Sequence, residues 1–170
     1  MKPKDTEKGL TADRLREVIR YEPETGRLFW LKGNNQNKIG DEAGWLTRHG
    51  YLRITVFGNR YMAHRLAWLY MTGEWPPEKI DHINTDRLDN RWVNLRSATD
   101  GQNSANQKIS KINMLGVKGV RLHKCGKYIA RICKDRRQMY LGVFDTLEAA
   151  KAAYGAKAKE LFGEFARADS

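Results

Sequence analysis

The chain has 170 residues with an ordinary apolar content of 41%, which suits one medium domain or two small ones. No stretch approaches the roughly 18 apolar residues of a membrane span, and the charged start MKPKDTEKGL has no hydrophobic run behind it, so we expect neither a transmembrane helix nor a secretory signal. The net charge of +11 favours a polyanionic partner, because Lys and Arg contacts release the counterions condensed on phosphates.

Short helices and hairpins are predicted for the first third of the chain. Residues 11–20 place apolar side chains on one helical face, with Thr11 available as the N-cap. A turn at Thr25-Gly26 then leads into a strand over residues 28–31.

A strand meander and a helix are predicted next. Residues 51–57 and the run from Tyr61 onward alternate like strands and are joined by Gly58-Asn59, a two-residue hairpin signal. The segment HRLAWLYMTGEW is spaced for a helix that ends at Gly73.

The most polar stretch is IDHINTDRLDNRWVNLR, residues 80–96. Apolar residues flank it, and Val93–Leu95 resumes a strand. A helix follows, in which Thr99 and Gln102 have the spacing of a capping box. The polar run therefore lies in a strand–loop–strand hairpin that leads into a helix.

Basic residues dominate the beginning of the C-terminal third. Between Lys108 and Arg137 there are ten lysines and arginines and a single acidic residue. Three strand-like runs follow a polar linker: GVRLHK, KYIARICK and QMYLGVF. Thr146 can cap a final helix that presents a stripe of apolar side chains and ends near Gly163; the stripe comprises Ala149, Ala150, Ala153, Tyr154, Ala158 and Leu161.

The adjacent pair Asp81-His82 carries the groups that phosphodiester hydrolysis needs. A neutral imidazole accepts a proton near pH 7, and a hard divalent cation held by oxygen ligands neutralises phosphate charge. Adjacent side chains of a strand point to opposite faces, so one shared site requires a twisted or bulged backbone. The alternative is that both are turn residues that bond the local backbone.

The segments AHRLAW and IDHINTDRLDNRWVNLRSATDGQNSANQ together resemble the HNH, or ββα-metal, endonucleases of the phage homing type. The resemblance implies that His82 is the general base and that Asp81 and Asn103 bind one Mg²⁺ or Mn²⁺ ion. It also implies that Asn94 stabilises the loop. It assigns no role to Asn90 or Asn106, and a packed or capping His64 remains an alternative to a phosphate contact.

Residues 116–165 resemble the AP2 DNA-binding domain, in the pieces GVR, GKYIARI, YLGVFDTLEAAKAAY and FGEFA. That family inserts a three-stranded sheet into the major groove. Strand alternation places Ile129 and Cys133 on the face away from the helix. On this face we expect groove contacts from Arg121, His123, Arg131, Gln138 and Tyr140, and phosphate contacts from Lys127, Lys134, Arg136 and Arg137.

The predicted fold class is α+β, with hairpins and helices leading into the HNH motif and then a sheet with one helix. We divide the chain into a nuclease domain (1–107), a basic linker (108–117) and an AP2-like domain (118–170). The expected function is a metal-dependent DNA endonuclease that acts on double-stranded DNA in the cytoplasm of a bacterial or phage-infected cell, as a monomer or weak dimer. A non-catalytic DNA binder with a degenerate HNH scaffold is the alternative. The spacing of Cys125 and Cys133 does not favour a structural zinc site.

Overall fold

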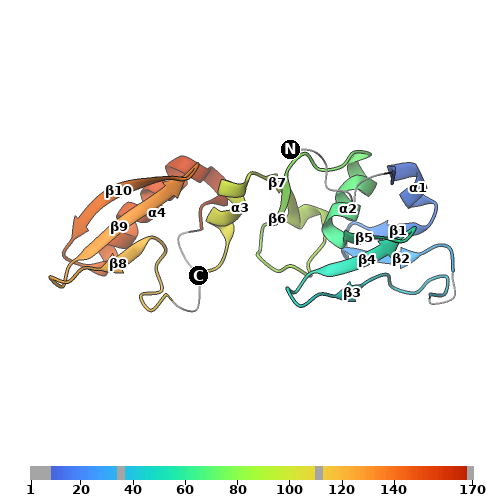
Figure 1. The fold of residues 1–170 in the computed structure, drawn as a ribbon, viewed down its shortest axis with the longest axis horizontal. Coiled ribbons are helices and arrows are strands. Elements are labelled where there is room, and N and C mark those ends of the chain that lie inside the picture. Colours follow the sequence, from blue (N-terminus) through green and yellow to red (C-terminus); the bar gives the residue numbers. More distant parts are fainter. Residues whose placement is uncertain (1–8, 34–36, 110–112, 168–170) are drawn as a thin grey trace. The chain divides into compact units, whose positions relative to one another are not determined.

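The computed structural model describes residues 9–33, 37–109 and 113–167 (Figure 1). It divides into two compact units, residues 1–97 and 98–170. Each unit combines short antiparallel strands with helices, so the predicted α+β class is confirmed. Among the described residues, no helix is both long enough and apolar enough to cross a membrane.

The first unit begins with a helix that is shorter than predicted. Helix α1 (Ala12–Arg16) is capped by the Thr11 hydroxyl, which accepts a hydrogen bond from the Arg14 amide. The prediction of a helix to residue 20 is wrong, because β1 (Ile19–Glu22) pairs antiparallel with β2 (Arg27–Trp30). Pairing along this hairpin outweighs the helical spacing of the apolar residues.

A three-stranded antiparallel sheet follows, in the order β3-β4-β5. It consists of β3 (Trp45–Leu46), β4 (Leu52–Val56) and β5 (Asn59–Met62). Val56 pairs with Asn59, so the two turn residues are Phe57 and Gly58, one position earlier than predicted. Both have positive φ, as this kind of tight hairpin requires.

Helix α2 (Ala63–Thr72) contributes one side of the first unit's core. It ends as predicted at Gly73, whose left-handed φ of 83° lets its amide bond the Leu69 carbonyl. The largest fully buried apolar side chains come from α1, the two sheets and α2: Leu15, Ile19, Leu28, Ile54, Val56, Leu66 and Leu69.

The predicted hairpin around the polar stretch is present. Strand β6 (Lys79–His82) pairs with β7 (Leu95–Ala98), and helix α3 (Asp100–Asn106) follows with the predicted capping box. The strand predicted from Val93 begins only at Leu95, because Trp92–Asn94 forms a 3-10 turn. The Trp92 amide of this turn bonds the Pro23 carbonyl, which fixes the turn against the first hairpin.

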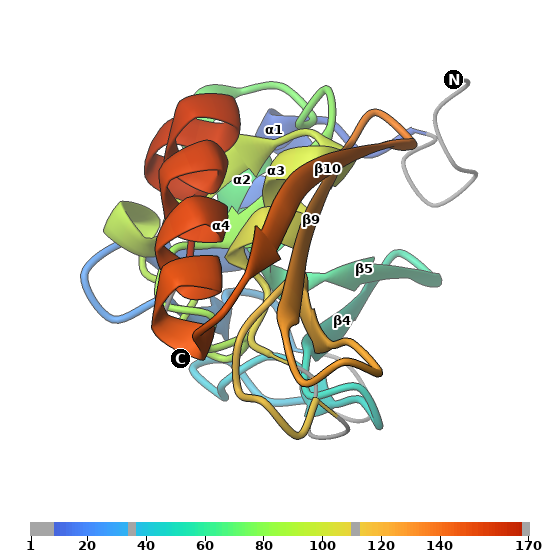
Figure 2. The ribbon, with the colours of Figure 1, turned by 90° about the vertical axis from the view of Figure 1, so that its left-hand side faces the viewer.

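The second unit contains the three predicted strands and the closing helix. Strands β8 (Val120–Leu122), β9 (Tyr128–Lys134) and β10 (Arg137–Phe144) form an antiparallel sheet in the order β10-β9-β8. Helix α4 (Leu147–Phe162) covers one face of this sheet (Figure 2), and a 3-10 turn, Gly163–Phe165, follows it.

Helix α4 packs through a narrower stripe than predicted. The Thr146 hydroxyl accepts a hydrogen bond from the Ala149 amide, which confirms the cap. Ala150, Ala158 and Phe162 are buried, but Ala149 is exposed, so its assignment to the apolar stripe is wrong. Ala149 lies in the capped first turn, whose packed side is taken by Ala150.

Helix α3 belongs to the second unit. Its Ala105 packs against a cluster that includes Ala158 and Phe162 of α4. The division by packing therefore falls before the predicted end of the nuclease domain at residue 107, which is a functional boundary and stays a prediction. Residues 110–112 of the predicted linker lie outside the described residues.

Candidate functional site

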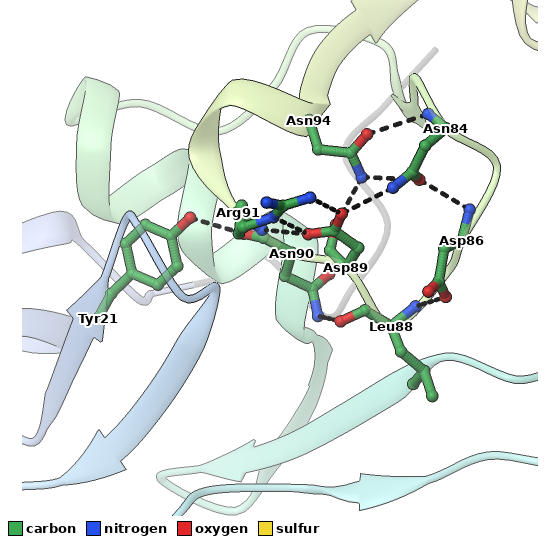
Figure 3. Close-up of polar contacts among 8 residues, drawn as sticks. All are labelled: Tyr21, Asn84, Asp86, Leu88, Asp89, Asn90, Arg91 and Asn94. Carbon is green, nitrogen blue, oxygen red and sulfur yellow. Dashed lines mark hydrogen bonds and ion pairs between the residues drawn. The ribbon is translucent and has the colours of Figure 1, made fainter.

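The side chain of Asn94 forms hydrogen bonds across the loop that joins β6 to β7 (Figure 3). Its Oδ1 accepts from the Asn84 amide at 3.0 Å, and its Nδ2 donates to Asn84 Oδ1 at 3.0 Å and to the Asp89 carbonyl at 2.7 Å. Its own carbonyl accepts from the Ile83 amide at 2.9 Å. The side chain is buried, so these bonds replace those that water would make.

Asn84 and Asp86 of the loop bond local backbone, as turn residues do. Asp86 Oδ1 accepts from the Leu88 amide at 3.0 Å, and Asn84 Oδ1 accepts from the Asp86 amide at 2.8 Å. The Arg91 guanidinium, 2.6 Å from Asp89 Oδ2, lowers the pKa of that carboxyl to about 2. Part of the polar stretch therefore serves to shape the loop.

His82 lies at the end of β6 and is buried, with 4% of its surface exposed. Its Nε2 is 3.2 Å from Asn90 Oδ1, and its ring lies edge-on to His64 at 5.1 Å between centroids. Tyr51 is the third ring of this group, 6.2 Å from His82. Burial lowers the pKa of His82 below its ordinary value, against the opposing effects of the Asn90 hydrogen bond and the Asp81 charge. The imidazole is therefore neutral near pH 7 and able to accept a proton.

His64 is a packed residue in the first turn of α2. It is buried against Tyr51, at 5.4 Å between ring centroids, and His82. Burial, with a smaller effect from His82, lowers the pKa of His64 to about 3. No side chain caps the N-terminus of α2, so His64 is not a capping residue. Its burial agrees with the predicted packing role.

Asp81 precedes His82 on β6 but makes a different contact. Its Oδ2 accepts from Nε of Arg96 on β7 at 2.9 Å, and both side chains are largely buried. Asp81 meets Arg96 while His82 meets Asn90 and His64, as expected for successive residues of a strand. Arg96 was not predicted as a site residue, although the NLR sequence at the start of β7 contains it.

Asn103, the second predicted metal ligand, lies on α3 in the second unit. The Asn103 amide bonds the Thr99 carbonyl at 2.9 Å in the first turn. The Thr99 hydroxyl accepts from the Gln102 amide, and Gln102 Oε1 accepts from the Thr99 amide. The capping box fixes the helical turn that carries Asn103.

In the second unit the face opposite α4 carries most of the predicted DNA contacts. Ala130 and Ile132 pack toward α4, whereas Arg121 and Tyr140 are exposed, as the alternation predicts. Ile129 departs from the expectation for an outward residue, because it is buried beside its strand partners Arg121 and Val143. His123, Arg136, Arg137 and Gln138 are exposed, and Lys134 is partly buried.

Arg131 lies at a hollow of about 940 Å³ lined by residues of β9, β10 and α3. Its Nη1 donates to Gln138 Oε1 at 3.1 Å. Its Nε is buried and has no hydrogen-bond partner among the described residues. Arg131 therefore lines this hollow with one donor buried and another bonded to Gln138.

Two further features bear on the phosphate contacts predicted for this sheet. The Lys127 ammonium pairs with Asp145 Oδ1 at 2.8 Å, which raises the pKa of Lys127. Asp135 and Arg136 form the turn between β9 and β10 with positive φ, and so hold the Arg136 backbone at the tip of the hairpin. Cys125 and Cys133 are not joined by a disulfide.

Comparison with known proteins gives matches of three kinds. Residues 61–105 match the family model of the HNH endonucleases. An uncharacterized HNH endonuclease of Acanthamoeba polyphaga mimivirus is 33% identical over 123 residues, which are 72% of this chain and 64% of that protein, so the chain spans less than two thirds of this relative. A structure described as DNA binding and cleavage by the HNH homing endonuclease I-HmuI is 19% identical, with a TM-score of 0.41 over 84% of this chain and 82% of that one.

The family match covers the residues that the geometry singles out. It begins in β5, includes α2 with His64 and the whole β6–loop–β7 hairpin, and ends within α3, just after Asn103. Residues 61–105 are therefore the part of this chain that is similar to the HNH endonucleases.

Proposed function

We propose that the protein is a metal-dependent, homing-type DNA endonuclease that hydrolyses phosphodiester bonds and binds its target through the sheet of the second unit. One observation carries the proposal. A buried, neutral histidine, His82, directly follows a buried carboxylate, Asp81, within the residues that match the HNH endonucleases. A proton acceptor and a hard oxygen ligand on neighbouring residues are the two groups that hydrolysis of a phosphodiester requires.

His82 acts as the general base in this proposal. Neutral imidazole takes a proton from water, the resulting hydroxide attacks phosphorus, and the P–O3′ bond breaks. The leaving 3′-oxygen takes a proton from solvent water, which leaves a 5′-phosphate and a 3′-hydroxyl. Asn94 holds the loop between the two strands in its conformation through its bonds to Asn84 and Asp89. The base and its surroundings are therefore arranged before DNA binds, which avoids reorganisation during the reaction.

The donor set suits a divalent ion such as Mg²⁺ or Mn²⁺. Asp81 and Asn103 would hold it, with water as the remaining ligands, because Mg²⁺ is commonly bound through one or two carboxylates and keeps several waters. In the described part of the chain no three His, Cys, Asp or Glu side chains gather as a metal-binding group. The bound ion would supply positive charge to the phosphate oxygens and the leaving 3′-oxygen.

The second unit positions the protein on DNA in this proposal. Arg121, Arg131 and Gln138 read base edges, and the exposed arginines at the tip of the hairpin contact phosphates. The basic linker follows the DNA backbone. A single active site cuts one strand, so a monomer nicks DNA and double-strand cleavage needs a dimer or a second binding event.

A non-catalytic DNA binder is the second candidate, and the Asp81–Arg96 pair favours it. An arginine already neutralises the charge of the carboxylate that would bind metal. One oxygen bonded to arginine is still compatible with an ion on the carboxylate, so the pair does not remove Asp81 from the ligand set.

Supercoiled plasmid provides the test. The protein is incubated with plasmid and Mg²⁺, Mn²⁺ or EDTA, beside His82→Ala and the matched control His49→Ala, which removes an exposed histidine. We expect metal-dependent relaxation that is lost in His82→Ala, by at least about a hundredfold for a general base, and retained in His49→Ala. Open-circle product indicates nicking, and linear product indicates double-strand cleavage.

Two other outcomes would contradict parts of the proposal. Cleavage retained by His82→Ala removes this residue as the base. Tight binding of a selected target without cleavage in either metal supports the non-catalytic candidate.

A further inference from the structure

We infer that Asn90 is a positioning residue for His82: its side-chain amide fixes the imidazole tautomer so that Nε2 carries the proton and Nδ1 carries the lone pair. The inference rests on the proposed function, because it assigns the atom of the base that accepts the proton from water. The sequence and the family match give Asn90 no role.

The hydrogen bond between the two residues is shielded from water. Asn90 Oδ1 lies 3.2 Å from His82 Nε2, and the two residues expose 2% and 4% of their surfaces. A polar pair this deeply buried costs free energy if its bond is lost, so the bond selects one protonation pattern of the ring.

The orientation of the amide is set by its other end. Asn90 Nδ2 donates to the Leu88 carbonyl at 3.2 Å (Figure 3). A carbonyl only accepts, so the amide nitrogen must face Leu88 and the amide oxygen must face His82. An amide oxygen has no proton to donate, and Nε2 must therefore be the N–H of the neutral ring. A neutral imidazole has one N–H, so its lone pair lies on Nδ1.

The backbone of Asn90 is fixed by a hairpin far away in the sequence. The Tyr21 hydroxyl on β1 donates to the Asn90 carbonyl at 2.6 Å, and Figure 3 shows this phenol directed at the loop. Burial raises the pKa of Tyr21, which keeps the hydroxyl protonated as the donor. At Gly26, with φ of 74°, a Cβ would lie 2.5 Å from the Asn90 carbonyl carbon, so the β1–β2 turn packs directly on this residue. These contacts hold the backbone of Asn90, while the Leu88 carbonyl holds its side-chain amide.

The ring of His82 is confined on its other sides as well. His64 meets it edge-on and Tyr51 lies beside it, which limits rotation of the imidazole. With rotation limited, the identity of the protonated nitrogen depends on the acceptor that faces Nε2, and this acceptor is Asn90 Oδ1.

Tautomer state is measured directly by long-range ¹H–¹⁵N correlation of the histidine rings in the folded protein, without DNA or metal, at a pH where imidazole is neutral. The signal of His82 is assigned by its loss in His82→Ala. We expect the pattern of the Nε2–H tautomer in the wild type and in Asn90→Asp, whose carboxylate oxygen still accepts. In Asn90→Leu, which keeps the shape but removes the acceptor, we expect a shift toward the Nδ1–H form. Asn106→Leu replaces another buried asparagine in the same way and should leave the His82 signal unchanged.

A wild-type His82 with Nδ1 protonated overturns the inference. So does an Asn90→Leu variant that folds, by its amide spectrum, yet keeps the pure Nε2–H pattern. Cleavage kinetics form a separate arm: Asn90→Leu should lower kcat by about tenfold to a hundredfold with little change in KM, and Asn90→Asp should restore part of the loss. If the protein shows the expected tautomer pattern but cuts no DNA, the positioning role of Asn90 is supported. Only the nuclease proposal is then contradicted.

Discussion

The candidate site residues of the first unit are buried and hydrogen-bonded to protein groups, whereas most of the predicted DNA contacts of the second unit lie on an exposed sheet face. Asp81, His82, Asn90 and Asn94 each expose less than a tenth of their surface. On the sheet, Tyr140 exposes 61% of its surface. The contrast agrees with the roles proposed for the two surfaces, because a base needs a defined environment before substrate arrives, while a reading surface must remain accessible.

This difference in burial predicts different effects for substitutions in the two regions. A substitution in the buried loop of the first unit should lower stability and activity together, since it leaves buried partners without hydrogen bonds. A substitution on the sheet should lower DNA affinity or selectivity and leave the free energy of unfolding nearly unchanged, because solvent replaces the lost contact.

Asn94→Ala tests the buried side of this comparison with the largest expected effect. The change removes three side-chain hydrogen bonds and leaves groups of Asn84 and Asp89 without their partner. We expect the free energy of unfolding in urea to fall by about 2–4 kcal/mol, with cleavage reduced in parallel. Asn59→Ala, at an exposed position at the start of β5, is the control and should change stability little. Unaltered stability in Asn94→Ala would show that the loop is not held by this side chain.

The packed His64 predicts the pH dependence of stability. Its folded-state pKa is about 3, so below about pH 6.5 the unfolded chain binds a proton that the folded protein does not. Stability from this residue is therefore present above pH 6.5 and is lost as the pH falls, with a limiting slope of about 1.4 kcal/mol per pH unit. His82 acts in the same direction.

Urea unfolding between pH 5 and pH 7.5 measures this slope. In His64→Gln the residue no longer titrates, so the variant should lose less stability than the wild type over this range, whatever its stability at pH 7.5. Equal slopes in the two proteins would mean that His64 is not kept neutral by its surroundings.

The sequence predicts a structural feature well when the contacts that determine it join residues close together in the chain. The end of α2 at Gly73 and the capping box of Thr99 and Gln102 involve residues a few positions apart, and both predictions are confirmed. The helix expected over residues 11–20 is wrong beyond Arg16, because pairing between β1 and β2 decides that segment.

The contacts that complete the candidate site were not predictable by the same reasoning. The bond from Tyr21 to Asn90 joins residues 69 positions apart, and the pair of Arg96 with Asp81 depends on how β6 meets β7. Residue type and spacing identify Asp81 and His82 as reactive groups, but which side chains orient them is decided by tertiary packing. For the sheet, alternation identifies the outward face and does not reveal that Ile129 is buried on it.

Arg131→Ala tests whether the sheet reads bases. If the guanidinium contacts a base edge, the change should cost about 1–3 kcal/mol in discrimination at one base pair and leave the other positions unaffected. The measurement is binding to a set of targets with single substitutions, with unfolding in urea as the control for structure. Lys151→Ala, on the exposed side of α4, should change neither quantity. A loss that is uniform across all targets would make Arg131 a phosphate contact.

The smallest effects are expected at the phosphate contacts, and they distinguish paired from unpaired charges on the sheet. Arg137→Gln should weaken binding to all sequences alike and reduce the slope of log K against log salt by about 0.9, the value for one phosphate contact. Lys127→Gln should reduce that slope by less, because the Lys127 ammonium already pairs with Asp145 at 2.8 Å and must give up this partner to bind phosphate. Asp145→Asn should then strengthen binding by freeing Lys127. If Lys127→Gln and Arg137→Gln lower the slope equally, the exposed ion pair opens on DNA binding at no measurable cost, and the predicted difference between paired and unpaired charges is wrong.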